Sequence, residues 1–372
     1  MAIVDVLAEI TKDGASDIFV VAGRPLSYKK KGQIVTYPKT EYDADGKEVE
    51  KPRLMPADTD AFVSDIYSLA GGRNMERLRK CGDDDFSFAI GGVARFRINA
   101  YKQRGSLSAV IRVINFNIPN PSDLLIPDKI MSFSELKKGL VLVTGPAGSG
   151  KSTTLACMID NINKNRQSHI ITLEDPLEYL HQNKKSIVSQ REVITDTDTY
   201  LTALRASLRQ SPDVILLGEM RDYETMSVAM TAAETGHLIL STLHTIGASN
   251  TIDRIIDAFP SNQQHQIAVQ LSMVLQAVVS QQLIPTVDGG IVPAFEIMTL
   301  TPAIKNMIRE SKVHQIDGMI ATSRSEGMIS MDTSLLELVQ SGKVDAKVAL
   351  EYAQDADLLR KKIAAATSLK DS

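Results

Sequence analysis

Uninterrupted apolar runs alternate with helically spaced apolar residues through the middle of the chain. The runs that predict strands cover 140–144, 169–174, 214–218 and 237–243. The stretches that predict helices lie between them, at 152–165, 199–209 and 222–235. Buried parallel strands joined by helical crossovers have this pattern, because helices cover both faces of the sheet. The middle of the chain therefore predicts an α/β fold with a parallel sheet.

The parts before and after this region are organised differently. Residues 1–115 mix short helices and strands, which predicts a smaller α+β domain. A linker is expected at 116–123, where two prolines and two asparagines occur. Residues 124–372 are expected to form the second domain, which ends in a helical region.

Two further stretches complete this division of the chain. The tail after about residue 262 is expected to be mainly helical, with amphipathic pieces at 334–341, 345–354 and 357–366. The polar stretch 29–56 predicts an exposed hairpin or loop.

Composition and charge narrow the class of protein. Of 372 residues, 43% are apolar and 23% charged, as in soluble globular proteins. No apolar run approaches the roughly 18 residues of a membrane span, and the N-terminus is acidic where a signal peptide is basic. Cys81 and Cys157 form neither a metal-binding spacing nor a disulfide framework. We expect a cytoplasmic protein, and the net charge of −4 argues against a general nucleic-acid surface.

A phosphate-binding motif follows the first predicted strand of the second domain. It matches the G-x-x-x-x-G-K-[ST] pattern, and its residues are Gly145, Pro146, Ala147, Gly148, Ser149, Gly150, Lys151 and Ser152, followed by Thr153 at the start of a predicted helix. Such a loop turns backbone N–H groups onto phosphate oxygens, and the helix N-terminus adds its positive dipole. Lys151 would contact the β/γ-phosphates and the Ser152 hydroxyl would bind Mg²⁺. The sequence therefore predicts binding of ATP with Mg²⁺.

Glu219 ends the strand Val214-Ile-Leu-Leu-Gly-Glu219 and is a candidate catalytic acid. The carboxyl ends of parallel strands face one crevice, so Glu219 should lie beside the phosphate loop and orient or deprotonate water. Gly218 occupies the position where a first acid is common, which leaves Mg²⁺ to Ser152, to water or to another acid. The alternative is that Glu219 caps the next helix.

Two other strand ends carry polar candidates. Glu174 and Asp175 end the second strand and are candidates to bind Mg²⁺ through water, in place of the missing acid. The alternative for them is a helix start or a solvated turn. His244 ends the fourth strand on the same face as Thr242 and is placed to hydrogen-bond the γ-phosphate or Glu219. A purely structural histidine is the alternative.

A basic stretch stands out in the first domain. Residues 86–115 contain five cations and no Asp or Glu: Arg95, Arg97, Lys102, Arg104 and Arg112. Phe96 and Ile98 should share one strand face, which leaves Arg95 and Arg97 on the other. Arginines without acid partners suit an anionic target, such as a triphosphate bound by a neighbouring subunit. The alternatives are a solvated basic face or an RNA or DNA surface.

In this order the segments resemble the type IV pilus retraction ATPases, the PilT-like branch of the type II/IV secretion ATPase superfamily. The matching pieces are 14–18, 95–99, 103–105, the phosphate loop, 174–178, 218–222 and 235–245. Gly218 before Glu219 is the form of this motif in that family. Residues 303–310 are similar to the signature of the retraction branch, from which Lys305 and Met307 depart.

The resemblance implies a homohexameric ring with an N-terminal PAS-like domain and a RecA-like P-loop motor domain. It implies that Lys151 and Glu219 are essential for ATP hydrolysis and that Glu174 and His244 assist. It further implies that Arg97, Arg104 and Arg112 reach the nucleotide from the adjacent subunit. Hydrolysis would drive pilus disassembly and twitching motility from the cytoplasmic face of the inner membrane, through a platform protein that also brings the chain to the membrane.

Other functions stay open from the sequence alone. The chain is either the principal retraction motor, a paralogue, or another secretion-type ATPase. A nucleic-acid translocase would use the same loop and place the arginines on the polymer, although the overall charge gives no expectation of a nucleic-acid partner. A non-motor nucleotide switch would bind ATP without sustained turnover.

Overall fold

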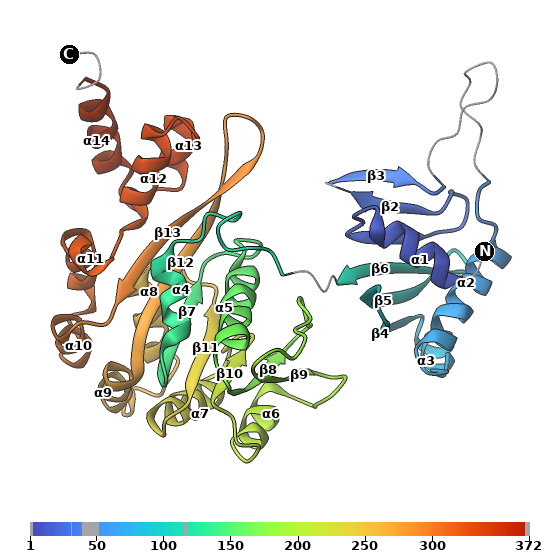
Figure 1. The fold of residues 1–372 in the computed structure, drawn as a ribbon, viewed down its shortest axis with the longest axis horizontal. Coiled ribbons are helices and arrows are strands. Elements are labelled where there is room, and N and C mark those ends of the chain that lie inside the picture. The colour runs from blue at the N-terminus through green and yellow to red at the C-terminus, as the bar shows by residue number, and fades with distance from the viewer. Residues whose placement is uncertain (1–2, 31, 39–51, 115–117, 369–372) are drawn as a thin grey trace. The chain divides into compact units, whose positions relative to one another are not determined.

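A computed structural model describes residues 3–30, 32–38, 52–114 and 118–368 (Figure 1). The chain divides into two compact units, Met1–Asn117 and Ile118–Ser372. Most of the polar stretch 29–56 falls on 39–51, outside the described residues, and so do the first two residues of the expected linker. Residues 29–30 and 33–36 of the polar stretch lie on two antiparallel strands that pair with each other in the N-terminal unit.

The N-terminal unit is a six-stranded antiparallel sheet with three helices (Figure 1). The spatial order of its strands is β3-β2-β1-β6-β5-β4. The strands are β1 (Asp17–Val20), β2 (Ser27–Lys30), β3 (Gln33–Thr36), β4 (Asp83–Ile90), β5 (Ala94–Gln103) and β6 (Ser106–Ile114). The helices are α1 (Ile3–Lys12), α2 (Pro56–Leu69) and α3 (Glu76–Cys81).

Strand β5 shows why this unit folds as the sequence predicts. Phe96 and Ile98 are fully buried in its core, against Ile66 and Tyr67 of α2. Arg95 and Arg97 alternate with them and lie half-buried on the opposite face. The expected parity of this strand is therefore confirmed.

The C-terminal unit contains a seven-stranded sheet in the order β13-β12-β7-β11-β10-β8-β9. Its strands are β7 (Gly139–Thr144), β8 (His169–Glu174), β9 (Ile187–Glu192), β10 (Val214–Leu217), β11 (Leu238–Leu243), β12 (Leu275–Pro285) and β13 (Ile291–Thr299). All neighbouring pairs in it are parallel except β12 with β13, which are antiparallel. The four predicted strands are parallel, as expected, and the sheet is mixed because β13, which was not predicted, pairs antiparallel with β12.

Helices pack on both faces of this sheet (Figure 1). Those that accompany the parallel strands are α4 (Asp128–Ser132), α5 (Lys151–Asn165), α6 (Tyr200–Ser207), α7 (Tyr223–Glu234), α8 (Ala248–Asp257) and α9 (Gln264–Val274). Leu140 and Leu142 of β7 face the core formed with α7 to α9, whereas Val141 and Val143 face the core formed with α4 and α5. Burial on both faces explains why the strands appear as uninterrupted apolar runs.

The end of the chain corrects one expectation. Strands β12 and β13 lie within the tail that was expected to be mainly helical, and the polar Ser280, Gln281 and Gln282 are buried in β12. The helices that follow are α10 (Pro302–Arg309), α11 (Ile316–Thr322), α12 (Met331–Gln340), α13 (Ala346–Glu351) and α14 (Ala356–Ser368). The last three lie where amphipathic pieces were expected, and they pack with Ile284 and Val292.

Candidate active site

The phosphate loop connects β7 to α5 and has little space for side chains. Gly145 has a φ of 138°, and a Cβ on it would lie 2.1 Å from the backbone oxygen of Gln281 on β12. Only glycine tolerates both the backbone conformation and this close approach. The loop ends at Gly150, directly before the first residue of α5. It therefore forms a backbone cradle at the N-terminus of a fifteen-residue helix, which suits an anion.

Lys151 lies over this cradle. Its Nζ donates hydrogen bonds to the carbonyl oxygens of Gly145, at 2.9 Å, and of Pro146, at 2.8 Å. Burial lowers the pKa of Lys151, and the nearby carboxylates of Glu178 and Glu219 oppose this shift. The hydroxyl of Ser149 is buried in the same loop without a hydrogen-bond partner among the described residues. An ammonium and an unpaired hydroxyl in one cradle fit phosphate oxygens.

One cavity of about 560 Å³ joins the phosphate loop to the carboxyl ends of the strands. Residues 147–153 form one wall. The other candidate residues that line it are Glu174, Asp175, Glu219, Thr242 and His244. Strands β8, β10 and β11 bring these side chains together because their carboxyl ends meet at one edge of the sheet. The candidates that the sequence placed in this region share a single site.

Glu219 is held between two basic side chains. Its Oε1 lies 2.5 Å from Nη2 of Arg221, and its Oε2 lies 3.6 Å from Nε2 of His244. The Glu219 side chain is only 12% exposed, whereas those of Arg221 and His244 are largely in solvent. The sequence reasoning did not assign a role to Arg221, although it lies two residues after Glu219.

Gly218 lies in crowded surroundings that disfavour an acid side chain. A Cβ at this position would lie 2.9 Å from the Tyr200 hydroxyl and 3.2 Å from the Leu173 backbone oxygen. Tyr200 itself lines the cavity, and burial raises its pKa above the usual range, with a further contribution from Glu219. The tyrosine therefore occupies the space that an acid side chain would need.

Glu174 and Glu178 have different surroundings. Burial raises the pKa of Glu174 to about 7, although Gln190 Nε2 donates a 3.4 Å hydrogen bond to it. The Ser152 hydroxyl donates to Oε1 of Glu178 at 2.9 Å. The hydroxyls of Thr153 and Tyr179 are also 2.9 Å apart. The acid in direct contact with Ser152 is thus Glu178. It lies in the segment 174–178, but only Glu174 and Asp175 of that segment were candidates to bind Mg²⁺.

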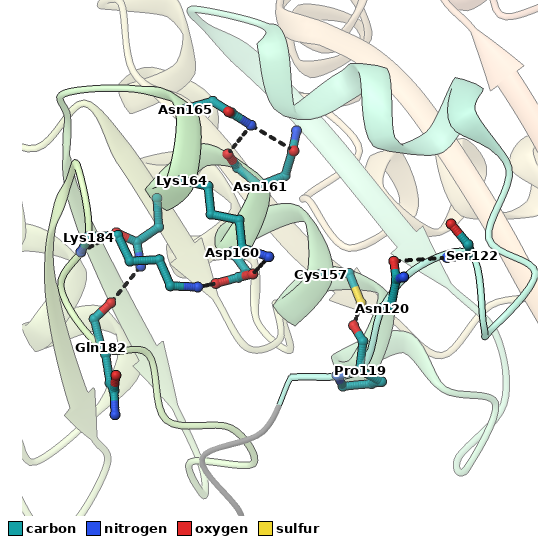
Figure 2. A network of polar contacts seen from close by, with 11 residues as sticks. Pro119, Asn120, Ser122, Cys157, Asp160, Asn161, Lys164, Asn165, Gln182 and Lys184 are labelled. Carbon is teal, nitrogen blue, oxygen red and sulfur yellow. Dashed lines mark hydrogen bonds and ion pairs between the residues drawn. The ribbon is translucent and has the colours of Figure 1, made fainter.

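Polar contacts fasten the segment after Glu178 to α5, the helix of the phosphate loop (Figure 2). The buried carboxylate of Asp160 pairs with Lys164 at 2.6 Å and also with Lys184. The backbone oxygen of Gln182 accepts a 2.7 Å hydrogen bond from the Asn163 side chain. Together with the contacts of Ser152 and Thr153 near the start of α5, these contacts hold the segment that contains Glu178 against the helix.

Figure 2 also shows Cys157, which lies about one turn before Asp160 on α5 and whose thiol donates to the backbone oxygen of Pro119 at 3.4 Å. Cys157 is buried, and burial raises the pKa of its thiol to about 11. The thiol is therefore neutral at physiological pH and serves as a packing residue.

The three candidate arginines belong to the N-terminal unit. Arg97 and Arg112 are directly opposite each other on β5 and β6. Arg112 pairs with Asp17 of β1 at 3.1 Å, so the expectation that these arginines have no acid partner was wrong for Arg112. Its partner comes from a strand distant in sequence, which is why the acid-free stretch concealed it. Arg104 is exposed in the β5–β6 turn, where its φ is 51° and that of Gly105 is 83°.

The donor groups in the cavity fit a magnesium ion shared with phosphate. Among the described residues no cluster of three His, Cys, Asp or Glu side chains could bind a metal on its own. The Ser152 hydroxyl and the carboxylate of Glu178 are oxygen ligands of the kind that Mg²⁺ prefers, and its remaining ligands are usually phosphates and water. Binding of Mg²⁺ by these residues would thus depend on the nucleotide.

Comparisons with known proteins match nearly the whole chain. The family model described as type II/IV secretion system protein matches residues 1–366. The chain is 44% identical over 354 residues to the type IV pilus retraction ATPase PilT of Pseudomonas aeruginosa, covering 95% of this chain and 98% of the relative. It is 39% identical over 352 residues to the type IV pilus ATPase PilU of the same organism, covering 94% and 88%.

A solved structure gives the same picture. The crystal structure of the pilus retraction motor PilT with bound ADP has a TM-score of 0.85 and 43% identity to this chain, covering 97% of this chain and 99% of that one. Both the antiparallel sheet of the first unit and the mixed sheet of the second therefore belong to a known α/β fold. In the part of the chain that is described, no helix combines the length and apolarity needed to cross a membrane.

Proposed function

Because the chain belongs to the type II/IV secretion system protein family, we propose that it is the motor that retracts type IV pili by hydrolysing ATP. It is an ATPase of the PilT and PilU type. The observation that carries the proposal is the cavity that Lys151, Ser152 and Glu219 share. Hydrolysis needs a phosphate cradle and an acid at the attacking side, and both lie at one sheet edge.

The loop, Lys151, Glu219 and the groups around them have different roles in this reaction. The loop amides and Lys151 bind the phosphates of ATP, and Lys151 exchanges its carbonyl partners for phosphate oxygens. Glu219 orients the attacking water and accepts its proton, while Arg221 and His244 fix the carboxylate. Mg²⁺, held by Ser152 and by Glu178, Glu174 or Glu219 directly or through water, would neutralise charge on the phosphates.

The arrangement of domains in the proposal follows the family resemblance. Residues 1–115 form a PAS-like domain, 116–123 a linker and 124–372 a RecA-like motor domain. Six copies form a ring, in which Arg97, Arg104 and Arg112 approach the nucleotide of the adjacent subunit. Among these, Arg104 has the position that best suits a reaching side chain, because it is exposed at the tip of a hairpin.

The proposed site of action is the cytoplasmic face of the inner membrane. There the ring would act on an integral-membrane platform protein and promote removal of pilin subunits. The similarity to PilT supports retraction, and the similarity to PilU supports a paralogue as the second candidate. Residues 303–310, which carry the signature-like sequence, fall mostly on α10.

A deletion strain tests the assignment to retraction. Loss of this chain is expected to leave cells with excess surface pili and without twitching motility, and re-expression of the wild type should restore movement. A strain complemented with the Glu219→Gln variant should remain excessively piliated. Bald cells would indicate an extension motor instead, and unchanged pili and motility would favour the paralogue.

A further inference from the structure

A second cavity adjoins the nucleotide cavity at Glu219 and contains no residue of the phosphate loop among its lining residues. Its volume is about 360 Å³, and the polar residues that line it are Glu219, Arg221, Thr242, His244, Thr245 and Arg254. The first four of these also line the nucleotide cavity. The two cavities therefore share one wall, which is made of the side chains next to the reacting phosphate. We propose that the second cavity binds inorganic phosphate after ATP hydrolysis, an inference that rests on the proposed function.

The charge of this cavity favours a small anion. Two guanidinium groups and one imidazole line it, and Glu219 is its only carboxylate among the described lining residues. Arg221 already contacts Glu219 at 2.5 Å and offsets its negative charge. Arg254 has no ion pair or hydrogen bond with the described residues, so its guanidinium donors are available to a ligand. A guanidinium binds two oxygens of a phosphate at once.

Arg254 is carried by a firmly anchored helix. At the N-terminus of α8, the Gly247 and Ala248 amides donate to Ser280 Oγ at 3.0 Å and to Glu296 Oε1 at 2.7 Å. The hydroxyls of Thr245 and Thr251 are 2.7 Å apart, which joins the cavity wall to the helix one turn before Arg254. The backbone position of Arg254 is therefore set by the fold, while its exposed side chain is free to turn toward a ligand in the cavity.

The chemistry of hydrolysis explains why a second anion site belongs here. Cleavage leaves ADP on the loop and frees a phosphate beside Glu219, where two anions repel each other. A phosphate that moves past Glu219 meets Arg221 first and Arg254 beyond it. Arg221 can transfer a hydrogen bond from the Glu219 carboxylate to the phosphate, because both are oxyanions that accept from a guanidinium. The second cavity thus offers the product a binding site separate from the loop that holds ADP.

Inhibition by inorganic phosphate tests this site in the full-length protein. Steady-state ATP hydrolysis is measured at increasing phosphate for the wild type, Arg254→Gln, Arg254→Lys and Arg205→Gln. Arg205 is exposed on α6 and outside both cavities, which makes it the matched control. Arg254→Gln should need about tenfold more phosphate for half-inhibition, the effect of losing one charge-assisted hydrogen bond. Arg254→Lys should be intermediate, and Arg205→Gln should match the wild type.

A second readout follows the product itself. Total cleaved phosphate after acid quench is compared with free phosphate reported by a phosphate-binding sensor. In Arg254→Gln the delay between cleavage and release should shorten, because the weakened site holds the phosphate for less time, whereas the Arg205→Gln control keeps the wild-type delay.

Two results would overturn the inference. One is phosphate inhibition that is the same in wild type and Arg254→Gln while the wild type turns over normally. The other is a lower native mass of Arg254→Gln, which would assign the residue to contacts between copies of the chain. A wild type that does not hydrolyse ATP at all would instead refute the proposed function, and this inference with it.

Discussion

The hydroxyl of Ser152 donates a 2.9 Å hydrogen bond to the carboxylate of Glu178. This contact joins the last residue of the phosphate-loop motif to the acidic segment 174–178 at the end of β8. A nucleotide with its metal ion would have to enter between groups that already contact each other. Binding at the loop is therefore linked directly to the position of the acid segment.

Removing the charge of Glu178 should affect the magnesium requirement. Glu178→Gln keeps the shape of the side chain and an acceptor for Ser152, but loses the negative charge. The Mg²⁺ concentration for half-maximal ATP hydrolysis should rise about tenfold, as expected for one charged contact. Glu351→Gln on α13, outside the cavity, serves as control. An unchanged magnesium dependence would exclude Glu178 from the metal site.

Lys151→Ala should abolish ATP binding. The variant loses the ammonium that lies over the loop, and Gly145 and Pro146 lose one hydrogen-bond donor to their carbonyl oxygens. Binding of a fluorescent nucleotide measures the effect, and thermal unfolding without nucleotide shows that the fold is retained. Lys138→Ala, an exposed lysine just before β7, should bind normally. Retained binding and turnover in Lys151→Ala would contradict the assigned role.

Asp160 should stabilise the protein at neutral pH. Burial tends to raise its pKa, but Lys164 and Lys184 outweigh this and hold the pKa below its usual range. A depressed pKa in the folded state gives stability that is present above the unfolded pKa, about 4, and is lost as the pH falls through the folded pKa. Asp160→Asn should therefore unfold about 1–2 kcal/mol more easily at pH 7, a modest value because both lysines are partly exposed.

Urea denaturation at pH 7 and at acid pH measures this effect. The difference between wild type and Asp160→Asn should shrink as the pH falls below about 4. Lys164→Ala, which removes only the more exposed lysine, should cost less. Equal stability of wild type and Asp160→Asn at pH 7 would show that the two ion pairs contribute nothing.

The proposed contribution of Arg104 from the adjacent subunit can be tested by mixing. Arg104→Ala and Lys151→Ala should each be inactive or weak alone. In rings formed from equal amounts of both, about one interface in four combines an intact loop with an intact Arg104 and should recover activity. Mixing Arg104→Ala with wild type gives the reference for subunit exchange. If exchange occurs without recovery, Arg104 does not act in trans.

The sequence was most informative where side chains are buried on both faces. Strands such as β10, whose residues Val214 to Leu217 are all buried, have no polar interruption and were predicted almost to the residue. The phosphate loop was equally well predicted, because its position in the sequence is marked by glycines that the structure requires. Gly145 leaves room for the backbone of β12, and Gly148 and Gly150 have positive φ angles. Local pattern is sufficient where local structure and burial agree.

Strand β12 shows where that reasoning fails. Its residues Ser280, Gln281 and Gln282 are polar yet buried, which breaks the apolar run. Each of the three has a hydrogen-bond partner. Ser280 accepts from the Gly247 amide, Gln281 accepts from the Thr154 hydroxyl at 2.8 Å, and Gln282 donates to the backbone oxygen of Tyr352 at 3.2 Å. These partners are distant in sequence, so no local pattern could reveal them.

The same limit applies to the site. Glu174, Glu219 and His244 end strands, and topology alone brings strand ends together. Glu178 and Arg254 instead reach their cavities from a connecting segment and a helix, whose paths depend on tertiary contacts such as Asp160 with Lys184. The sequence pattern placed Glu178 only within the acidic segment 174–178, and it did not indicate that Arg254 lines a cavity.

In the proposed mechanism, ATP hydrolysis depends on Glu219, which accepts the proton of the attacking water. ATP binding and steady-state phosphate release are measured together for the wild type and Glu219→Gln. Glu219→Gln should bind ATP with an affinity close to wild type and lose at least about 100-fold in turnover, because the amide cannot accept the proton of water. Normal turnover by Glu219→Gln would contradict the mechanism at its core.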